Sequence, residues 1–257
     1  MSHASKPPSQ PVEPAIVTPA EARRRTRRAF IGFGLAGAFG GGAWAWLATR
    51  SDLDNIPWPL RRAHEANEAL SRTVFDPGKL GPEFPRSRAA EPRPNGSHGM
   101  PDRFANDWSV AVSWAGGAEQ RLDRKELFDG VERVESTIEF KCIEGWSQIV
   151  TWGGYRFVDV AAKRGWPVEK FANASMTTVD GSYYVGLDMP SLLHPQSLLC
   201  DAMNGEPLPF NHGGPVRLTM PVKYGIKSIK WLGRIELRND RPADYWAKRG
   251  YDWFSGH

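Results

Sequence analysis

Short runs with a period of two, separated by glycine and proline, limit most strongly what this chain can fold into. The clearest run covers residues 134–142, where mostly apolar side chains share one face, and charged residues with one threonine share the other. This alternation predicts a strand with one face in the core and Cys142 at its end, next to a loop. Further strand patterns occur at 104–114, 146–152, 183–187, 197–203, 216–220 and 229–237. The body of the chain is therefore predicted to be a strand-rich α+β fold.

Two short helical segments are expected within this body. Residues 59–72 carry apolar side chains near helical spacing, and residues 158–163 indicate one or two helical turns closed by Gly165. The apolar positions of the first segment are Leu60, Ala63, Ala66 and Leu70.

The chain length of 257 residues suits one sizeable core with a leader and is too short for several independent domains. Changes in composition along the chain suggest four parts. These are a disordered start at 1–22, a leader at 23–50, an extended lead-in at 51–90 and a single domain at 91–257.

The leader combines a basic cluster with an apolar run rich in glycine and alanine. Arg27 and Arg28 stand just before Phe30, which resembles the twin-arginine export signal; the alternative is an ordinary transmembrane anchor. Trp44 lies inside a small-x-small cleavage pattern, but with Trp46 it also suits a membrane interface, so cleavage stays open. We expect export of the folded chain to the periplasm by the twin-arginine machinery, with an inner-membrane anchor if the leader is not cut.

The formal net charge of +4 belongs to the leader and not to the body. Residues 46–257 carry 27 basic and 27 acidic side chains, so their net charge is zero. A neutral body lacks the electrostatic pattern of a nucleic-acid-binding protein, and we expect no nucleic-acid partner.

The chain has two cysteines, Cys142 and Cys200. Two cysteines exclude a disulfide-rich scaffold, a Cys/His zinc cluster and an Fe–S site, and there is neither a CxxC pair nor a CxxCH haem motif. Any redox chemistry would therefore depend on a bound cofactor and an external electron carrier.

Three segments carry a family resemblance. They read FKCIEGWS at 140–147, NGEPLPFNHGGPVRL at 204–218 and KYGIKSIKWLG at 223–233. In this order and spacing they resemble the sulfite oxidase family of molybdopterin enzymes, which includes the periplasmic methionine-sulfoxide reductase catalytic subunit. The resemblance spans about residues 90–250. It implies the strand-rich molybdopterin-binding fold of that family in a single domain, and a molybdenum-molybdopterin cofactor.

The resemblance implies that Cys142 binds the metal. A thiolate suits this role because soft sulfur ligands favour soft metal sites; the alternative is a buried, inert cysteine. By the same resemblance, His212 and Arg217 contact the cofactor, and the guanidinium fork of Arg217 matches phosphate oxygens. Residues implied to line the pterin-phosphate end are Ser228, Ile229 and Lys230, with solvated lysines as the alternative for Lys227 and Lys230.

Three upstream residues are weaker candidates for cofactor contacts. The family has an Asp or Thr in the loop that MTTVDG occupies here, which matches Thr178 or Asp180, with Asp180 preferred. An asparagine near the start of the domain also contacts the cofactor in some members, and Asn95 is its counterpart here. Each could equally be a turn former.

The Cys142 loop departs from the sulfite-oxidising pattern, in which an Asn-Arg-Arg stretch follows the cysteine and attracts anions. Here Glu144 has the opposite charge, and Trp146 suggests a more apolar opening. A small neutral S-oxide or N-oxide is therefore preferred as substrate, with sulfite dehydrogenase-type oxidation as the alternative. A membrane haem b protein is the expected electron partner.

Two other classes of protein are alternatives. The first is a non-catalytic exported binding domain, in which Cys142 and Cys200 are structural and form a disulfide in an oxidising compartment. The second is a cysteine hydrolase, for which His212 lacks an evident acidic partner in the sequence. The aromatic tail at 251–257 could contact a redox partner or pack back on its own domain.

Overall fold

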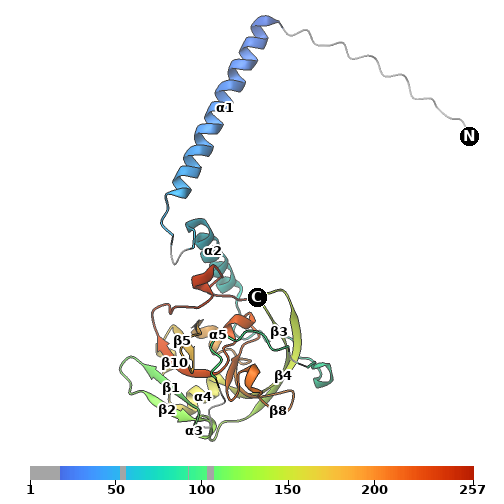
Figure 1. Ribbon diagram of the computed structural model, residues 1–257, viewed down its shortest axis with the longest axis vertical. Helices are drawn as coiled ribbons and strands as arrows, with labels where there is room; N and C mark the ends of the chain where they lie inside the picture. The colour runs from blue at the N-terminus through green and yellow to red at the C-terminus, as the bar shows by residue number, and fades with distance from the viewer. Residues whose placement is uncertain (1–17, 53–55, 92, 103–106) are drawn as a thin grey trace, which may run out of the picture. The chain divides into compact units, whose positions relative to one another are not determined.

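The computed structural model describes residues 18–52, 56–91, 93–102 and 107–257 (Figure 1). It divides into two compact units, residues 1–51 and 52–257. In the first unit, α1 covers Pro19–Ala48, and its N-cap Thr18 accepts a hydrogen bond from the backbone N–H of Glu21. The helix is long and apolar enough to cross a membrane, which agrees with a signal or an anchor.

The second unit holds the strands and the remaining helices. The strands are β1 (Ser109–Trp114), β2 (Gln120–Asp123), β3 (Val134–Lys141), β4 (Ser147–Arg156), β5 (Asn173–Thr178), β6 (Tyr184–Asp188), β7 (Leu198–Met203), β8 (Glu206–Pro207), β9 (Arg217–Thr219) and β10 (Leu232–Arg238). The α-helices are α2 (Trp58–Val74), α3 (Arg124–Phe128), α4 (Phe157–Arg164) and α5 (Met189–Leu192). The 3-10 helices are η1 (Arg86–Arg88), η2 (Val168–Lys170), η3 (Phe210–His212), η4 (Gly225–Lys227) and η5 (Ala247–Arg249).

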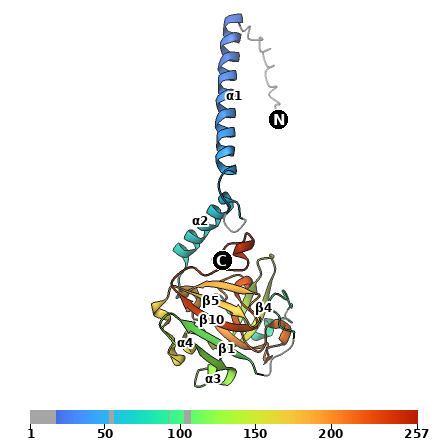
Figure 2. The same cartoon turned by 60° about the vertical axis from the view of Figure 1, so that its left-hand side comes forward.

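These strands build two sheets (Figures 1 and 2). The first has the order β2-β1-β10-β5-β6, and the second has the order β3-β4-β7-β8 with β9 also paired to β7. The main core packs buried residues of the first sheet against those of β7, β9 and α4, for example Met176, Ile235, Leu218 and Phe157. A smaller core within the second sheet contains Trp152 and Cys200. The α+β prediction is confirmed.

The alternating run at 134–142 forms β3, with Cys142 as the first residue beyond the strand. Antiparallel pairing with β4 ends at Lys141 and Ser147, and the backbone N–H of Cys142 then donates to the carbonyl of Trp146 at 2.8 Å. The pairing thus continues just long enough to fix the position of the cysteine.

Other strand predictions hold with shifted ends, and three of the described strands were not predicted. Strand β1 begins at Ser109, while residues 104–106 of its predicted run lie outside the described residues. The strands that were not predicted are β2, β5 and the two-residue β8. The sequences of β2 and β5, QRLD and NASMTT, are too polar for an apolar alternation to be visible. The predicted helix over 158–163 is α4, which ends at Gly165 with φ of 70°.

Helix α2 agrees in position with the predicted helix. Its apolar side, however, faces solvent, whereas the apolar side of a surface helix usually packs against the core. Its apolar positions Leu60, Ala63, Ala66 and Leu70 are all exposed. Its buried residue is Glu68, held between the guanidinium groups of Arg72 and Arg241. Polar contacts, and not apolar burial, therefore fix how α2 lies on the domain.

The C-terminal tail packs back on its own domain, in agreement with one of the two alternatives for it. Trp253 and Phe254 are buried, and the backbone N–H of Tyr224 donates to the carbonyl of Ser255. The ammonium group of Lys223 lies over the ring of Phe254. These contacts hold the tail against the loop that follows β9.

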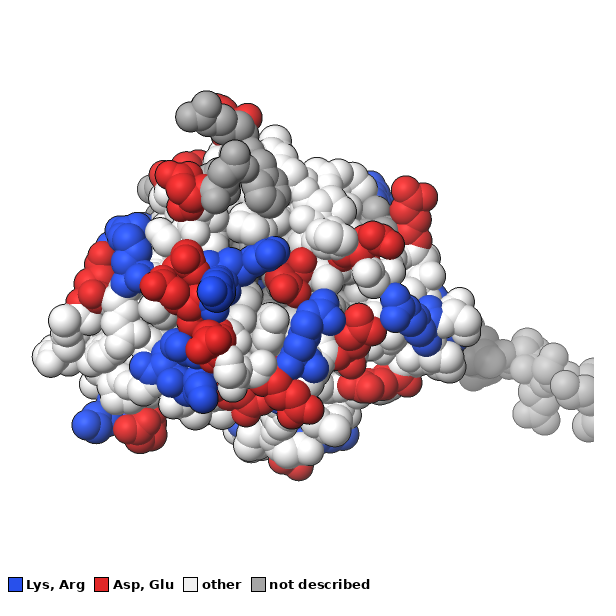
Figure 3. All heavy atoms as spheres, turned by 90° about the horizontal axis from the view of Figure 1, so that it is seen from below, with Lys and Arg blue, Asp and Glu red and all other residues white. Residues whose placement is uncertain are grey.

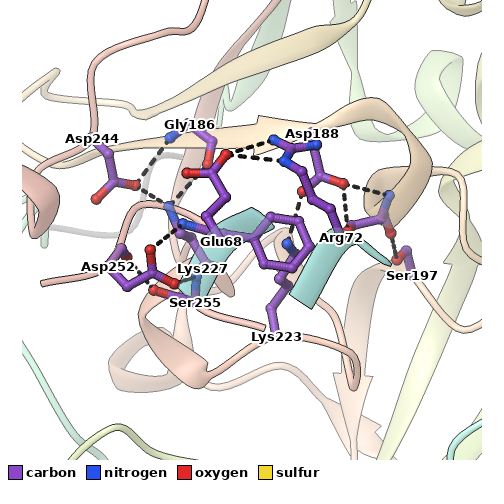
Figure 4. Close-up of polar contacts among 12 residues, drawn as sticks. Glu68, Arg72, Gly186, Asp188, Ser197, Lys223, Lys227, Asp244, Asp252 and Ser255 are labelled. Carbon is purple, nitrogen blue, oxygen red and sulfur yellow. Dashed lines mark hydrogen bonds and ion pairs between the residues drawn. The ribbon is translucent and has the colours of Figure 1, made fainter. Parts of the chain in front are cut away.

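Two ion pairs are buried beside the tail (Figure 4). Lys223 lies 2.8 Å from Asp188, and Lys227 lies 2.5 Å from Asp244, with each side chain at most 2% exposed. The alternative of a solvated charge is therefore wrong for Lys227. Because buried charges without partners are costly, these pairs fix the loop that contains the third motif.

We expect the substitution Asp244→Ala to destabilise the domain by about 3–5 kcal/mol, because it leaves the ammonium group of Lys227 buried without its counter-ion. The control Glu119→Ala removes exposed ion pairs with Arg121 and Arg234, and should cost less than about 1 kcal/mol. Chemical denaturation measures both. Equal costs would contradict the assigned importance of the buried pair.

Candidate active site

A cavity of about 260 Å³ opens beside the end of β3. It brings together residues from all three sequence motifs and from the loop at 93–98. Of the residues predicted from the sequence, those that line it are Asn95, Cys142, His212, Arg217, Ser228 and Lys230.

Cys142 is 8% exposed and occupies a tight turn. Gly145, with φ of 87°, donates its N–H to the carbonyl of Cys142, so the backbone reverses within four residues. The side-chain amide of Asn95 donates to Sγ of Cys142 at 3.7 Å. Burial, with the nearby charge of Glu144, raises the pKa of the free Cys142 thiol, so the thiolate needs a positive partner such as a metal ion.

The other cysteine lies in a different environment. Cys200 is fully buried in the smaller core, and burial raises the pKa of its thiol to about 12. Both cysteines are free, which argues against the disulfide on which the binding-domain hypothesis depends.

Arg217 is buried and lines the cavity. Its guanidinium donates to the carbonyls of His212 at 2.9 Å and Ser228 at 3.0 Å, and lies 4.7 Å from the ring centre of Trp152. Among the described residues, no carboxylate forms an ion pair with it, and burial lowers its pKa to about 10. A buried cation of this kind fits an anionic group of a ligand.

Lys230 adds a second positive charge to the wall. Its ammonium group donates to the carbonyls of Asn95 at 2.6 Å, Gly96 at 2.9 Å and Asn211 at 3.1 Å, which ties the loop at 93–98 to the second motif. These three bonds use all its N–H groups, so Lys230 acts through its charge and by positioning. Burial, and then the charge of Arg217, lowers its pKa to about 7. A bound anion would favour its charged form.

His212 lines the same cavity and is 7% exposed. Burial, followed by the charges of Arg217 and Lys230, lowers its pKa to about 4. At neutral pH the imidazole is therefore uncharged, and it can donate from one ring nitrogen and accept at the other.

The glycine after His212 is required by close packing. Gly213 has φ of 104°, and a Cβ atom there would lie 2.6 Å from Cβ of Lys230. The same close approach occurs at Gly225, where a Cβ would lie 2.6 Å from the ring of Phe140. The glycines of the second and third motifs therefore let these segments approach each other and β3.

Three candidates lie away from the cavity wall. Ile229 is buried in the main core. Thr178 donates from Oγ1 to Asp180 at 2.6 Å, and Asp180 accepts two further hydrogen bonds from Ser182. In the part of the chain that the structure describes, Thr178 and Asp180 therefore behave as turn formers and are not among the lining residues.

Several lining residues were not identified from the sequence. Arg93 and His98 come from the loop before β1, while Trp246 and Tyr251 come from the C-terminal region. Isolated aromatic and basic residues in irregular segments carry no periodic signal, so only the folded chain brings them to the cavity.

Glu144 organises the opening near Cys142. Its carboxylate accepts hydrogen bonds from the side-chain amide of Asn95 at 3.2 Å and from the indole of Trp146 at 3.0 Å. Arg93 stacks over the Trp146 ring at 5.3 Å. The opening therefore combines the negative charge of Glu144 and the positive charge of Arg93 with an aromatic wall.

We expect Gly213→Ala to destabilise the fold more than Gly116→Ala. Both glycines have positive φ, but a Cβ at Gly116 meets no atom within 4 Å, whereas one at Gly213 meets the backbone and side chain of Lys230. The shared backbone strain costs about 1–3 kcal/mol, and the difference reports the steric contact. Thermal unfolding of the two variants tests this; equal losses would show that the contact at Gly213 is unimportant.

Comparison with known proteins gives a family. A family model described as an oxidoreductase molybdopterin-binding domain matches residues 97–246, more than half of the chain. YedZ1 of Azospira oryzae, named provisionally as a protein-methionine-sulfoxide reductase subunit, is 28% identical over 211 residues, covering 80% of this chain and 79% of that protein.

Two relatives are named MsrP, the catalytic subunit of a protein-methionine-sulfoxide reductase. The one from Xanthomonas campestris is 32% identical over 153 residues, covering 54% of this chain and 47% of its own length. The one from Ralstonia nicotianae is 28% identical over 255 residues, covering 89% of this chain and 74% of its own length.

Among solved structures, the sulfane dehydrogenase SoxCD from Paracoccus pantotrophus matches 55% of this chain and 41% of its own chain, with 17% identity and a TM-score of 0.49. The assignment of the chain to a family rests on the family model and not on this partial structural similarity. The chain belongs to the molybdopterin-binding oxidoreductases of the sulfite oxidase family and is an enzyme with a molybdopterin cofactor.

Proposed function

We propose that this enzyme is the catalytic subunit of an exported molybdenum-molybdopterin reductase that acts on S-oxides, with methionine sulfoxide as the preferred class. The main support for this proposal is that Cys142 lies at the wall of a cavity. The opening of this cavity contains the aromatic ring of Trp146 and the carboxylate of Glu144. The relatives named as methionine-sulfoxide reductases support the same substrate class.

The cavity fits the proposed cofactor. The buried guanidinium of Arg217 lacks a carboxylate partner among the described residues, and Lys230 and the uncharged His212 lie beside it. This set suits the phosphate and polar groups of a pterin. Cys142 supplies the soft ligand that molybdenum requires. When bound, molybdenum supplies oxygen-atom transfer, in which a sulfoxide, two electrons and two protons give a thioether and water.

The residues of the chain would then divide the work. Cys142 holds the metal, and Asn95 orients its sulfur through the 3.7 Å contact. Arg217 and His212 bind the pterin tail, and Lys230 fixes the loop that carries Asn95. Ser228 presents its carbonyl to Arg217 and thereby holds the guanidinium in place.

Glu144 supports a neutral substrate. Its fixed negative charge lies beside Cys142, where it disfavours the approach of sulfite, a small anion. The Trp146 ring provides an apolar surface for the carbon substituents on the sulfur of a sulfoxide. Sulfite oxidation is the alternative reaction, and the kcat/KM values of the enzyme for sulfite and for a sulfoxide distinguish the two.

Electrons must come from outside the chain, because its two cysteines and its motifs provide no haem or Fe–S site. We propose a membrane haem b protein as the donor. The paired arginines before Phe30 and the length of α1 support twin-arginine export to the periplasm, with α1 as an anchor if it is not cleaved.

We expect Cys142→Ser to abolish sulfoxide reduction and to change the electron paramagnetic resonance signal of the metal, because the sulfur ligand is lost. The matched control is Cys200→Ser, which changes a cysteine outside the cavity and should retain turnover and the signal. Molybdenum content and circular dichroism of both variants establish loading and folding. Full activity of folded Cys142→Ser, or activity without molybdenum, would refute the proposal.

We expect Glu144→Gln to shift selectivity toward sulfite. The change removes a negative charge while keeping the shape of the side chain, so kcat/KM for sulfite should rise relative to that for methyl p-tolyl sulfoxide. The control is Glu139→Gln, a half-buried carboxylate on the preceding strand that does not line the cavity. An unchanged ratio in Glu144→Gln would remove the electrostatic argument for a neutral substrate.

A further inference from the structure

The outward face of α2 carries an apolar stripe. Leu60, Ala63, Ala66, Leu70 and Val74 recur every three or four residues, which places them along one side of the helix. Leu60 is 43% exposed, Leu70 is 65% exposed and Val74 is 72% exposed. A helix on a protein in contact only with water would normally turn such a stripe toward the core.

Specific polar contacts prevent α2 from rotating about its own axis to bury the apolar stripe. The carboxylate of Glu68, 7% exposed, accepts from Arg72 at 3.0 Å and lies 2.8 Å from Arg241 (Figure 4 shows Glu68 and Arg72). The Nε2 atom of His64 lies 2.8 Å from the carbonyl of Gly250. A rotation that buried the apolar stripe would expose these contacts and leave charges unpaired, so the outward stripe is built into the fold.

The apolar surface continues past the end of α2. A second cavity of about 450 Å³ is lined by Val74 and by apolar residues of the following loop, including Phe75, Leu80 and Phe84. Leu80 is itself 57% exposed. In contrast, the face seen from below carries interspersed acidic and basic side chains (Figure 3). Of the exposed large apolar side chains of the domain, Leu60, Leu70, Val74 and Leu80 lie on α2 and the loop that follows it, whereas Met100, Val179 and Tyr251 lie elsewhere.

The chain itself indicates what covers this stripe. Nine residues, 49–57, join the end of α1 to the start of α2. Fully extended, this connection reaches about 35 Å at most. Helix α1 is long and apolar enough to span a membrane, and its last turns carry exposed Trp44 and Trp46, the residue type enriched at membrane interfaces. With α1 inserted, α2 cannot leave the neighbourhood of the bilayer.

Exposed basic side chains lie on α2 and on the segment that packs against it. Arg62 is exposed on α2, and Lys248 and Arg249 are exposed on the segment that contacts α2 through Gly250, whereas Arg241 of that segment is already paired with Glu68. Glu65 pairs with Arg62 and offsets part of this charge. Exposed cations beside an apolar stripe match a lipid surface that contains anionic headgroups.

We propose that α2 lies on the bilayer surface, with Leu60, Leu70 and Val74 in the boundary between headgroups and acyl chains. The domain is then held by two elements, α1 through the membrane and α2 along it, and its orientation to the membrane is fixed. The inference rests on the proposed anchor but adds a second, independent contact.

The test uses the full chain in vesicles of phosphatidylcholine and phosphatidylglycerol, with nitroxide labels on single introduced cysteines. Labels at Leu70→Cys and Val74→Cys should be several-fold more accessible to oxygen, which concentrates in lipid, than to a water-soluble nickel chelate. The controls are Ala69→Cys, exposed on another side of α2, and Ala118→Cys in the β1–β2 turn. Both controls should show the reverse preference.

Each outcome decides a separate point. If Leu70→Cys and Val74→Cys resemble Ala118→Cys, α2 does not contact lipid and the proposal fails. If they show spin–spin broadening that persists in detergent, a second copy of the chain covers the stripe, and the proposal also fails. A label at Phe39→Cys on α1 reports the anchor alone, so loss of lipid contact there would reject the anchor without reference to α2.

Discussion

The buried guanidinium of Arg217 is the interaction on which the rest of the site depends. It joins the carbonyls of His212 and Ser228, so one cation connects the second motif to the third. The ring of Trp152 covers it, and no carboxylate among the described residues neutralises it. The fold thus contains a buried positive charge that is available to a ligand. Binding of an anion would offset the desolvation free energy that burial of this charge costs.

The same principle of paired and unpaired charge organises the rest of the domain. Lys227 is neutralised by Asp244 and serves the fold, whereas Lys230, only three residues later, bonds to carbonyls and leaves its charge to the cavity. On α2, Glu68 is satisfied by two arginines, and this turns the apolar stripe outward. In each case the identity of the partner decides whether a charged residue stabilises the structure or faces a ligand.

Much of the fold and part of the site could be predicted from the sequence. The alternation at 134–142 gave β3 with Cys142 at its end, and the motif residues Cys142, His212 and Arg217 do line one cavity. Strand β5 was missed because its inward residues alternate with Asn, Ser and Thr, which carry little apolar signal. Arg93 and Tyr251 could not be predicted, because they lie in segments without a period.

The sequence by itself determined the strand-rich class, the apolar leader and the motif residues, because these depend on local spacing and residue type. Only the tertiary structure decided which face of α2 is exposed, which lysine is paired and which distant aromatic residues line the cavity. Those outcomes depend on contacts between residues far apart in the chain, such as Glu68 with Arg241 and Lys230 with Asn95. Local sequence patterns do not identify such distant partners. The orientation of the charged residues and of the apolar stripe therefore cannot be predicted without the folded structure.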